Sequence, residues 1–288
     1  MARISYVKPH ASSFERIAHL QDRGLIVPRP KLAAHKIELI GYERLRIYFL
    51  SRRQLALAGS PFNPGTSYKD IIRLYDCDML LRDVCFAAVG QFELLLRNSM
   101  SEALSKSYGS HPYFQIAAFK DASSQVESVR LFADVYLKSK DRRAQHYRDT
   151  YSDPALPPIW RMKEFMTFGA TSRILQHLSG PIRTTIANDF GIPKDIILTN
   201  WVESLVDLRN ICAHHDRLFN RKFPKQPTKL VISTHHNKVP SAVSNSLKAI
   251  LECLDYMLAK RSAAFDVTGK VSAVISRYPE MLPAEAGF

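Results

Sequence analysis

The chain has 288 residues, of which 46% are apolar and 23% charged, so its composition excludes a disordered tail. No run approaches the roughly 20 apolar residues of a membrane-spanning helix, and 11 glycines with 16 prolines supply too few turns for an all-β sandwich or barrel. The excess of 40 Lys and Arg over 27 Asp and Glu, a net charge of +13, favours a polyanionic partner, with nucleic acid first and a merely solvated basic surface as the alternative.

Helical periodicity dominates the first half of the chain. The segment Ser12–Leu57 carries two helical patterns separated by the breaker Gly24–Pro30, and it ends in the turn-rich stretch Gly59–Ser67. From Tyr68 to Ser107, apolar side chains recur every three or four positions, which predicts one long core-facing helix or a kinked pair. A further helix is predicted over Tyr113–Tyr147.

In the second half, helical patterns alternate with proline and glycine breaks. The proline-dense segment Tyr151–Ile159 is expected to be extended, because each proline restricts the residue before it. Helices are predicted over Trp160–Leu178 and, after the breaks at Gly180-Pro181 and Gly191-Ile192-Pro193, over Asp195–Asn220.

The last part of the chain has the only strand signal. Within Lys222–Pro240, the sequence TKLVIST followed by HHNK predicts a short hairpin. The pair His235-His236 is interpreted as a solvated turn rather than a metal pair, because adjacent side chains point apart and no carboxylate lies at ligand spacing. A closing helix is predicted over Ser241–Phe265, with Ser241 as its N-cap.

Together these patterns predict an all-α protein. We expect an N-terminal helical extension, residues 1–67, followed by a helical bundle, residues 68–288, in one continuous compact unit with one short β-hairpin. The N-terminal sequence lacks the apolar core of a signal peptide, so a cytoplasmic protein without membrane contact is expected. The cysteines form no C-x-x-C pair, which favours reduced core thiols over disulfides or a zinc site. They are Cys77, Cys85, Cys212 and Cys253.

The segment Trp201–Phe223 carries the candidate chemistry. On a helix at about 100° per residue, it separates into an apolar side and a polar side. Asn210 and His214 are i,i+4 neighbours on the polar side, whereas Arg209 and His214 are about 140° apart. These two could converge on one phosphate only across a helix irregularity or across a symmetric pair of helices, and the second route predicts a homodimer. The apolar side contains Trp201, Leu205, Leu208, Ile211, Cys212 and Leu218.

Arginine, asparagine and histidine together suit cleavage of RNA without a metal. A guanidinium binds a phosphate bidentately, an imidazole transfers protons near neutral pH, and an amide orients the imidazole or holds a phosphate oxygen. The alternative for Arg209, Asn210 and His214 is structural, with His214 as a solvent-facing or capping residue near a helix end. No metal or other cofactor is expected.

Several longer elements follow one another over most of the chain. They are Arg44-Leu45 with Tyr48; Leu74-Tyr75 with Asp78, Leu81 and Arg82; Glu93 with Arg97; Pro158-Ile159-Trp160 with Glu164 and Thr167-Phe168-Gly169; and the segment from Trp201 to Arg221. On these elements the chain resembles the bacterial abortive-infection proteins of the AbiD/AbiF type, a branch of the HEPN superfamily of helical RNases and toxins. It departs from the pattern at Gly41, Glu43 and Cys77, away from the last element.

The resemblance implies a HEPN-like helical bundle with Arg209, Asn210 and His214 as the active-site residues. It also implies that a second copy of the chain completes the site. Antiviral toxins of this kind cut host or phage RNA, and some of their genes lie beside a small structured RNA that restrains the protein.

Supporting residues have two interpretations each. Glu93 and Arg97 are expected to form an ion pair, within one helix or to the Trp201 helix, or else to position substrate. His215 is expected to pack or to cap rather than to catalyse. Arg217, Asn220 and Arg221 are expected to continue the polar helix face by one and two turns, and either to contact RNA or to brace His214. The basic stretch Arg217–Lys229, with Lys222, Lys225 and Lys229, is expected either to contact RNA or to be a solvated connector.

Two functions remain in competition at this point. The first is a metal-independent endoribonuclease toxin of an abortive-infection or toxin–antitoxin system, which leaves 2′,3′-cyclic phosphate and 5′-hydroxyl ends. The second is a non-catalytic RNA-binding or assembly protein of a defence system, bound to a small structured RNA. The intact set of Arg209, Asn210 and His214 favours the enzyme.

Overall fold

The computed structural model describes residues 5, 9–232, 238–243, 245–261 and 265–288. These residues form twelve α-helices, three short 3-10 helices and one two-stranded antiparallel sheet. The prediction of an all-α protein with one short hairpin is therefore confirmed. Within the same residues, no helix combines the length and the apolar character that a membrane crossing requires.

The chain divides into two compact units. The first comprises residues 1–80 and 275–282, and the second comprises residues 81–274 and 283–288. The sequence predicts a boundary before residue 68, whereas in the structure the first turns of helix α4 (Tyr68–Tyr108) pack with the N-terminal helices. The prediction of one long helix or a kinked pair in this region resolves to a single helix of 41 residues.

The first unit begins with three helices where the sequence predicts two. Helix α1 is opened by a capping box, in which Ser12 and Glu15 exchange side-chain and backbone hydrogen bonds. The second predicted pattern is divided at Gly41, whose φ of 93° lies in a region that only glycine enters without strain. The helices are α1 (Ser13–Gln21), α2 (Pro30–Ile40) and α3 (Tyr42–Leu50).

A buried hydrogen bond joins α3 to α4 inside the first unit. The Tyr48 hydroxyl donates to Oδ2 of Asp78 at 2.7 Å, and both side chains are almost completely buried. The Tyr75 ring meets the Tyr48 ring edge-on at 5.9 Å. A buried carboxylate is tolerated only when donors surround it, so this bond fixes the register of the two helices.

In the second unit, two capping residues start helices at positions where the sequence predicts a continuous helix. The helix predicted over Tyr113–Tyr147 is wrong in extent, because Asp121 and Asp141 each accept a hydrogen bond from a backbone N–H and start separate helices. The segment predicted to be extended over Tyr151–Ile159 contains a series of bends and no strand, and Ile159 already belongs to α7. The elements are the 3-10 turns η1 (Pro112–Phe114) and η2 (Ile116–Ala118), then α5 (Ala122–Lys138), α6 (Arg142–Thr150), α7 (Ile159–Met162) and α8 (Phe168–His177).

Helices α9 (Gly180–Asp189) and α10 (Asp195–Ala213) follow. Helix α9 is absent from the sequence prediction, which treated Gly180-Pro181 only as a break. Proline is favoured in the first turn of a helix because its missing N–H has no intrahelical partner there. The end predicted for α10 at Asn220 is also wrong, since the helix stops at Ala213.

The predicted hairpin is confirmed by strands β1 (Leu230–Val231) and β2 (Lys238–Val239), paired antiparallel. The pair His235-His236 lies outside the described residues. Helix α11 (Leu247–Lys260) starts later than predicted, because Ser246 rather than Ser241 caps it. Helix α12 (Val267–Ser276) and the 3-10 turn η3 (Pro283–Ala286) complete the described chain.

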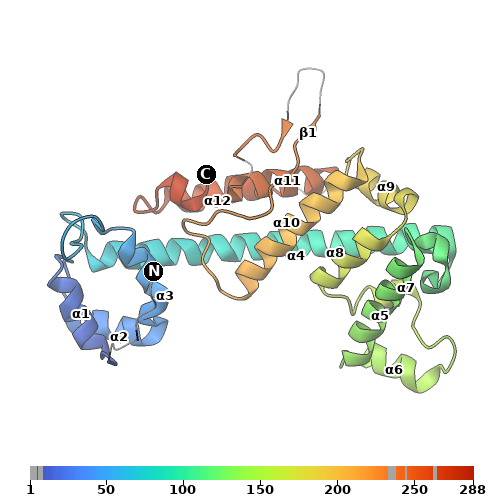
Figure 1. The fold of residues 1–288 in the computed structure, drawn as a ribbon, viewed down its shortest axis with the longest axis horizontal. Helices are drawn as coiled ribbons and strands as arrows, with labels where there is room; N and C mark the ends of the chain where they lie inside the picture. The colour runs from blue at the N-terminus through green and yellow to red at the C-terminus, as the bar shows by residue number, and fades with distance from the viewer. Residues whose placement is uncertain (1–4, 6–8, 233–237, 244, 262–264) are drawn as a thin grey trace. The chain divides into compact units, whose positions relative to one another are not determined.

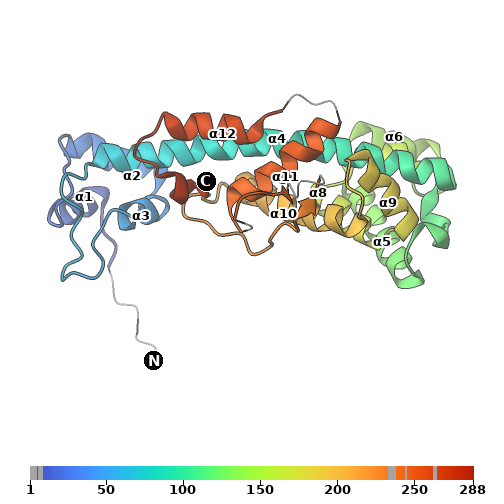
Figure 2. The same ribbon diagram turned by 90° about the horizontal axis from the view of Figure 1, so that it is seen from above.

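The core of the second unit forms where several helices cross. Helix α10 packs against α8, α9 and α11, and α5 packs against α8 (Figures 1 and 2). Phe92 of α4 contacts the rings of Phe168 and Phe190, which anchors α8 and the end of α9. All four cysteines are buried and none is in a disulfide, in agreement with the prediction of core thiols.

We predict that Tyr48→Phe lowers the free energy of unfolding by about 1.5–3 kcal/mol, because a donor to a buried carboxylate is lost. Tyr75→Phe is the matched control, since the Tyr75 hydroxyl makes no hydrogen bond with another described residue. Urea denaturation of both variants measures the difference. Equal stability of the two variants would contradict the role assigned to the Tyr48–Asp78 bond.

Candidate functional site at the end of α10

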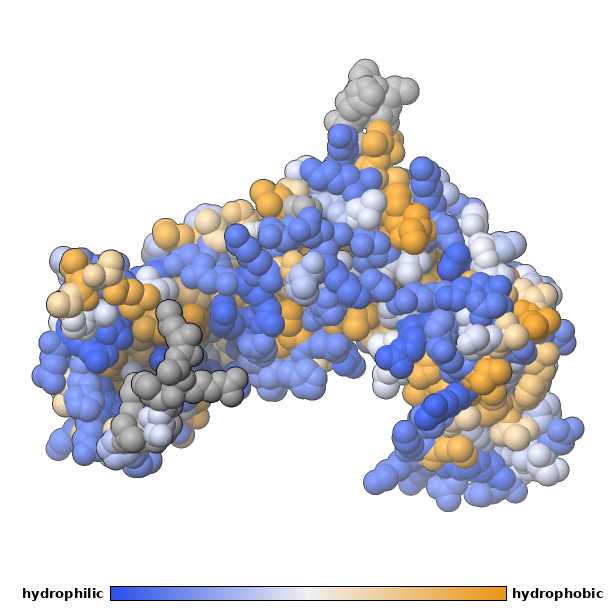
Figure 3. All heavy atoms as spheres, in the orientation of Figure 1, coloured by the Kyte–Doolittle hydropathy of each residue, from blue (hydrophilic) through white to orange (hydrophobic). Residues whose placement is uncertain are grey.

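Helix α10 is amphipathic in the way its sequence predicts. Asn210 and His214 are exposed and Arg209 is half-buried, while the opposite side of the helix belongs to the core. In Figure 3 the face around α10 is mainly hydrophilic. The buried side includes Trp201, Leu205, Leu208, Ile211 and Cys212, and Leu218 in the following loop is also buried.

A capping motif ends α10 directly after the candidate residues. The N–H of His215 donates to the carbonyl of Cys212 at 3.1 Å, and the N–H of Asp216 donates to that of Ile211 at 2.9 Å. This pair of bonds is a Schellman motif, and His215 occupies its left-handed position with φ of 55°. The structure therefore assigns His215 a capping role, one of the two roles expected for it, although its side chain is exposed.

Three polar residues, Arg209, Asn210 and His214, lie within six positions of one another at the end of α10. Nη1 of Arg209 donates to Oδ1 of Asn210 at 3.3 Å, and the N–H of His214 donates to the Asn210 carbonyl at 3.0 Å. Because its amide oxygen accepts from Arg209, the NH₂ group of Asn210 remains a donor for a ligand. A guanidinium, an amide donor and an imidazole are groups that can bind a phosphate and transfer a proton beside it.

The residues after the helix end do not continue its polar face. Arg217 donates to the carbonyl oxygens of Phe219 and Asn220, and Arg221 donates to Oδ2 of Asp216 at 2.5 Å. Burial opposes ionisation of Asp216, but hydrogen bonds from Arg221 and from the Arg217 backbone outweigh it and lower its pKa. Since the helix stops at Ala213, the sequence-based placement of Arg217, Asn220 and Arg221 on the same helix face is wrong.

The basic stretch beyond residue 221 folds back along α10. The Trp201 indole N–H donates to the Thr228 carbonyl at 2.8 Å, and the side-chain oxygen of Asn200 accepts from the Thr228 N–H at 2.7 Å. Nζ of Lys225 lies 2.9 Å from a Glu203 carboxylate oxygen. The positive charge of Lys225 is therefore largely balanced by Glu203. Lys222 in the same stretch is exposed and makes no hydrogen bond or ion pair with a described residue.

Glu93 and Arg97 form an ion pair within α4, which is the intrahelical arrangement expected for them. Both side chains are largely buried, and Nε of Arg97 has no hydrogen-bond partner among the described residues. No group of three His, Cys, Asp or Glu side chains in the described part of the chain is placed to hold a metal ion.

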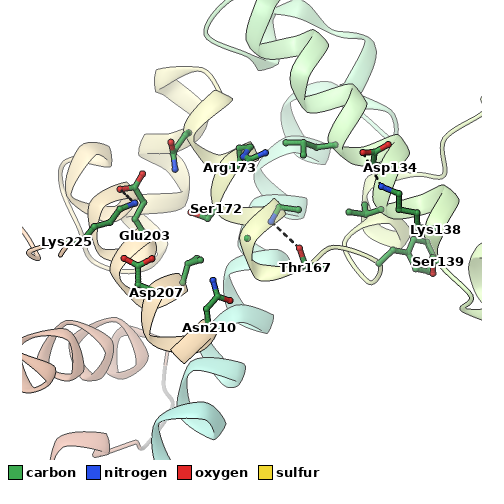
Figure 4. Close-up of a pocket in the computed structure, with 17 residues that line it drawn as sticks. Asp134, Lys138, Ser139, Thr167, Ser172, Arg173, Glu203, Asp207, Asn210 and Lys225 are labelled. Carbon is green, nitrogen blue, oxygen red and sulfur yellow. Dashed lines mark hydrogen bonds and ion pairs between the residues drawn. The ribbon is translucent and has the colours of Figure 1, made fainter. Parts of the chain in front are cut away.

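Beside Asn210 lies a cavity of about 800 Å³ that the sequence analysis did not anticipate. Its walls come from α5, α8 and α10, with Asp207 and Asn210 on the α10 side and Lys138 on the α5 side (Figure 4). Burial raises the pKa of the Asp207 carboxyl, and Lys225 offsets this only in part. The volume lies within the range of small-ligand pockets.

Gly169 belongs to the Thr167-Phe168-Gly169 element and lines this cavity. The Thr167 hydroxyl accepts from the Ala170 N–H at 3.2 Å and caps α8, and Phe168 is buried. A Cβ at Gly169 would meet no heavy atom within 4 Å, so close packing does not require glycine. The element thus supplies a helix cap, a core anchor and an open part of the cavity wall. Its Thr-Phe-Gly sequence was the signal by which it could be recognised.

The fold and the site define a helical protein with an Arg-Asn-x-x-x-His element at a helix end, in which the asparagine and the histidine are exposed. The sequence profile of the family described as Abi-like protein matches residues 35–220, which is 186 of the 288 residues. The chain therefore belongs to the Abi-like protein family. No curated protein and no solved structure gave a significant match.

We predict that Gly169→Ala raises the free energy of unfolding by about 0.4–1 kcal/mol, because alanine restricts the unfolded chain and meets no neighbour in the folded one. Thermal unfolding followed by circular dichroism measures the change. A loss of stability would show that the backbone of this cavity wall requires glycine.

Proposed function

We propose that this protein is a metal-independent endoribonuclease of an abortive-infection or toxin–antitoxin defence system, of the AbiD/AbiF type within the HEPN superfamily. The observation that carries the proposal is the placement of Asn210 and His214 on the exposed side of the end of α10, with half-buried Arg209 next to Asn210, over a buried core. Membership of the Abi-like family supports the defence role, and the net charge of +13 supports an RNA substrate.

Each residue of the set has a chemical role in this proposal. His214 removes the proton of the attacking 2′-hydroxyl or protonates the leaving 5′-oxygen. Arg209 binds the scissile phosphate and stabilises the charge that develops on it. Asn210, held by Arg209 through its amide oxygen, directs its NH₂ group to a phosphate oxygen. Attack of the 2′-oxygen on phosphorus, with departure of the 5′-oxygen, leaves a 2′,3′-cyclic phosphate and a 5′-hydroxyl.

A second copy of the chain completes the site in this proposal. Arg209 and His214 are five residues apart, so an ideal helix directs their side chains about 140° away from each other. Two copies of α10 meeting at a two-fold axis would bring the Arg209 of one copy to the His214 of the other. Ala213, small and only half-buried, permits a close approach of the helices. A small structured RNA that occupies the same surface would restrain the enzyme.

We predict that His214→Ala lowers the rate of RNA cleavage by about 10²–10⁴, because a group that transfers a proton is lost. Arg209→Lys is also severely impaired, since an ammonium cannot replace the bidentate guanidinium. Wild-type activity persists in EDTA. Gel analysis of total RNA and of a labelled loop substrate measures these effects, and the cut ends are identified by phosphatase and kinase treatment.

His215→Gly is the matched control for His214→Ala. The Schellman bonds at this position use backbone atoms only, and glycine adopts the left-handed conformation without strain, so cleavage and folding are retained. RNA binding without cleavage in the wild-type protein would contradict the enzyme and favour an RNA-binding assembly protein. Cleavage at the wild-type rate by His214→Ala would remove His214 from the mechanism.

We predict that a mixture of Arg209→Ala and His214→Ala chains recovers partial activity, whereas each variant alone is inactive. The reason is that a mixed dimer contains one site with an intact Arg209 and an intact His214 from different copies. Light scattering at micromolar concentration checks for the dimer. Full activity of a strict monomer would overturn the shared site.

A further inference from the structure

A second cavity, of about 550 Å³, lies between α6 and α7. Its walls are strongly basic, with Glu164 as the only acidic residue among those that line it. The cavity and its rim are called the Trp160 cleft. The residues that define it are Arg142, Arg143, His146, Trp160, Arg161 and Lys163.

Trp160 is presented to solvent by an anchored turn. Its side chain is 48% exposed, whereas the other tryptophan, Trp201, is completely buried. On either side of it in α7, Ile159 and Met162 are buried, and the Ile159 N–H donates to the Ser110 carbonyl at 2.9 Å. A large aromatic side chain held on a fixed turn and left half in solvent is a ready surface for stacking.

The cations of the cleft differ in how they are engaged. Arg143 pairs with Asp141 at 2.8 Å, and Lys163 donates to Oδ1 of Asn98 at 2.5 Å. In contrast, the exposed side chains of Arg142 and Arg161 make no hydrogen bond or ion pair with another described residue. Two guanidinium groups are therefore available beside the Trp160 ring, and they favour a ligand that carries several negative charges.

We propose that the Trp160 cleft binds an unpaired stretch of RNA, with one base stacked on Trp160 and flanking phosphates held by Arg142 and Arg161. Stacking requires a base that has left the helix, because the bases of a duplex are enclosed by their neighbours and cannot reach a side-chain ring. The proposal rests on the RNA substrate of the proposed function, and it specifies the form of RNA that is captured.

The cleft adjoins the cavity beside the candidate catalytic residues. Phe165 lines the Trp160 cleft and also lines the larger cavity, whose opposite wall includes Asn210. A single strand anchored on Trp160 can therefore extend past Phe165 toward the end of α10. This continuity makes the cleft a substrate-positioning surface rather than an isolated basic patch.

Fluorescence tests the stacking directly, because Trp160 is the only exposed tryptophan of two. A short 2′-O-methyl oligouridine is the probe, since its blocked 2′-oxygen prevents cleavage. We expect it to quench the emission of the full-length protein and to leave the emission of Trp160→Phe, which comes from Trp201, unchanged. With a labelled probe, Trp160→Ala raises Kd by about 5- to 150-fold, and Trp160→Phe retains most of the affinity.

Charge reversal tests the phosphate contacts. Arg142→Glu with Arg161→Glu lowers the affinity and reduces the salt dependence of log Kd by about 0.7 per lost contact. The matched control is Lys120→Glu with Arg130→Glu, which changes the net charge equally at exposed positions that line neither cavity. We expect the control to keep most of the affinity.

Three results would overturn the proposal: no quenching, equal affinity of Trp160→Ala and wild type, or equal loss in the two charge-reversed proteins. Equally tight binding of duplex RNA or of phosphatidylserine vesicles would also overturn it, by assigning the cleft to anions in general. Because the probe cannot be cut, these outcomes are independent of the His214→Ala result. Cleavage without stacking refutes the cleft alone, and stacking without cleavage refutes the enzyme alone.

Discussion

Burial of one side of α10 is the constraint on which the candidate site depends. Trp201 is completely enclosed and bonded through its indole N–H to Thr228, so the helix cannot rotate without breaking the core. With that side fixed, Asn210 and His214 are left at the surface. The Schellman motif then turns the chain at His215, which places His214 at the C-cap of the helix. Precise placement of a proton-transferring group needs this kind of support.

The pairing of individual charges says more about which cations are available to a polyanion than the net charge of the chain does. Arg221 is bonded to Asp216, Lys225 to Glu203, and Arg217 to backbone carbonyls, so much of the basic stretch beside α10 is already engaged. Such bonds hold the loops of the site in place and reduce the positive charge offered to a polyanion. In the proposed function, recognition of a phosphate backbone depends on the cations that make no ion pair with a described residue, which include Arg142 and Arg161.

In the proposed function, RNA binding at the Trp160 cleft is separated from the chemistry at the end of α10, and this separation has a physical advantage. A site with only Arg209, Asn210 and His214 binds one phosphate weakly in water, because each contact replaces a hydrated one. A stacked base and two further phosphate contacts at a distance supply affinity without adding groups around the scissile bond. In the same proposal, the cavity lined by α5, α8 and α10 is the space for the nucleotides between the two regions, since Phe165 and Asn210 both line it.

The sequence alone determined the helical class, the amphipathic character of α10 and the candidate triad, because these depend on periodicity and on residues close together in the chain. It misplaced the starts of α5 and α11, where the choice among several polar caps depends on which bond the fold completes, and the end of α10, which a backbone Schellman motif sets. Only the tertiary structure decided the pairing of Lys225 with Glu203 and the two cavities joined at Phe165. These features bring together residues that are distant in sequence. Each helix could pack in many arrangements, so no local sequence pattern predicts how the helices pack against one another.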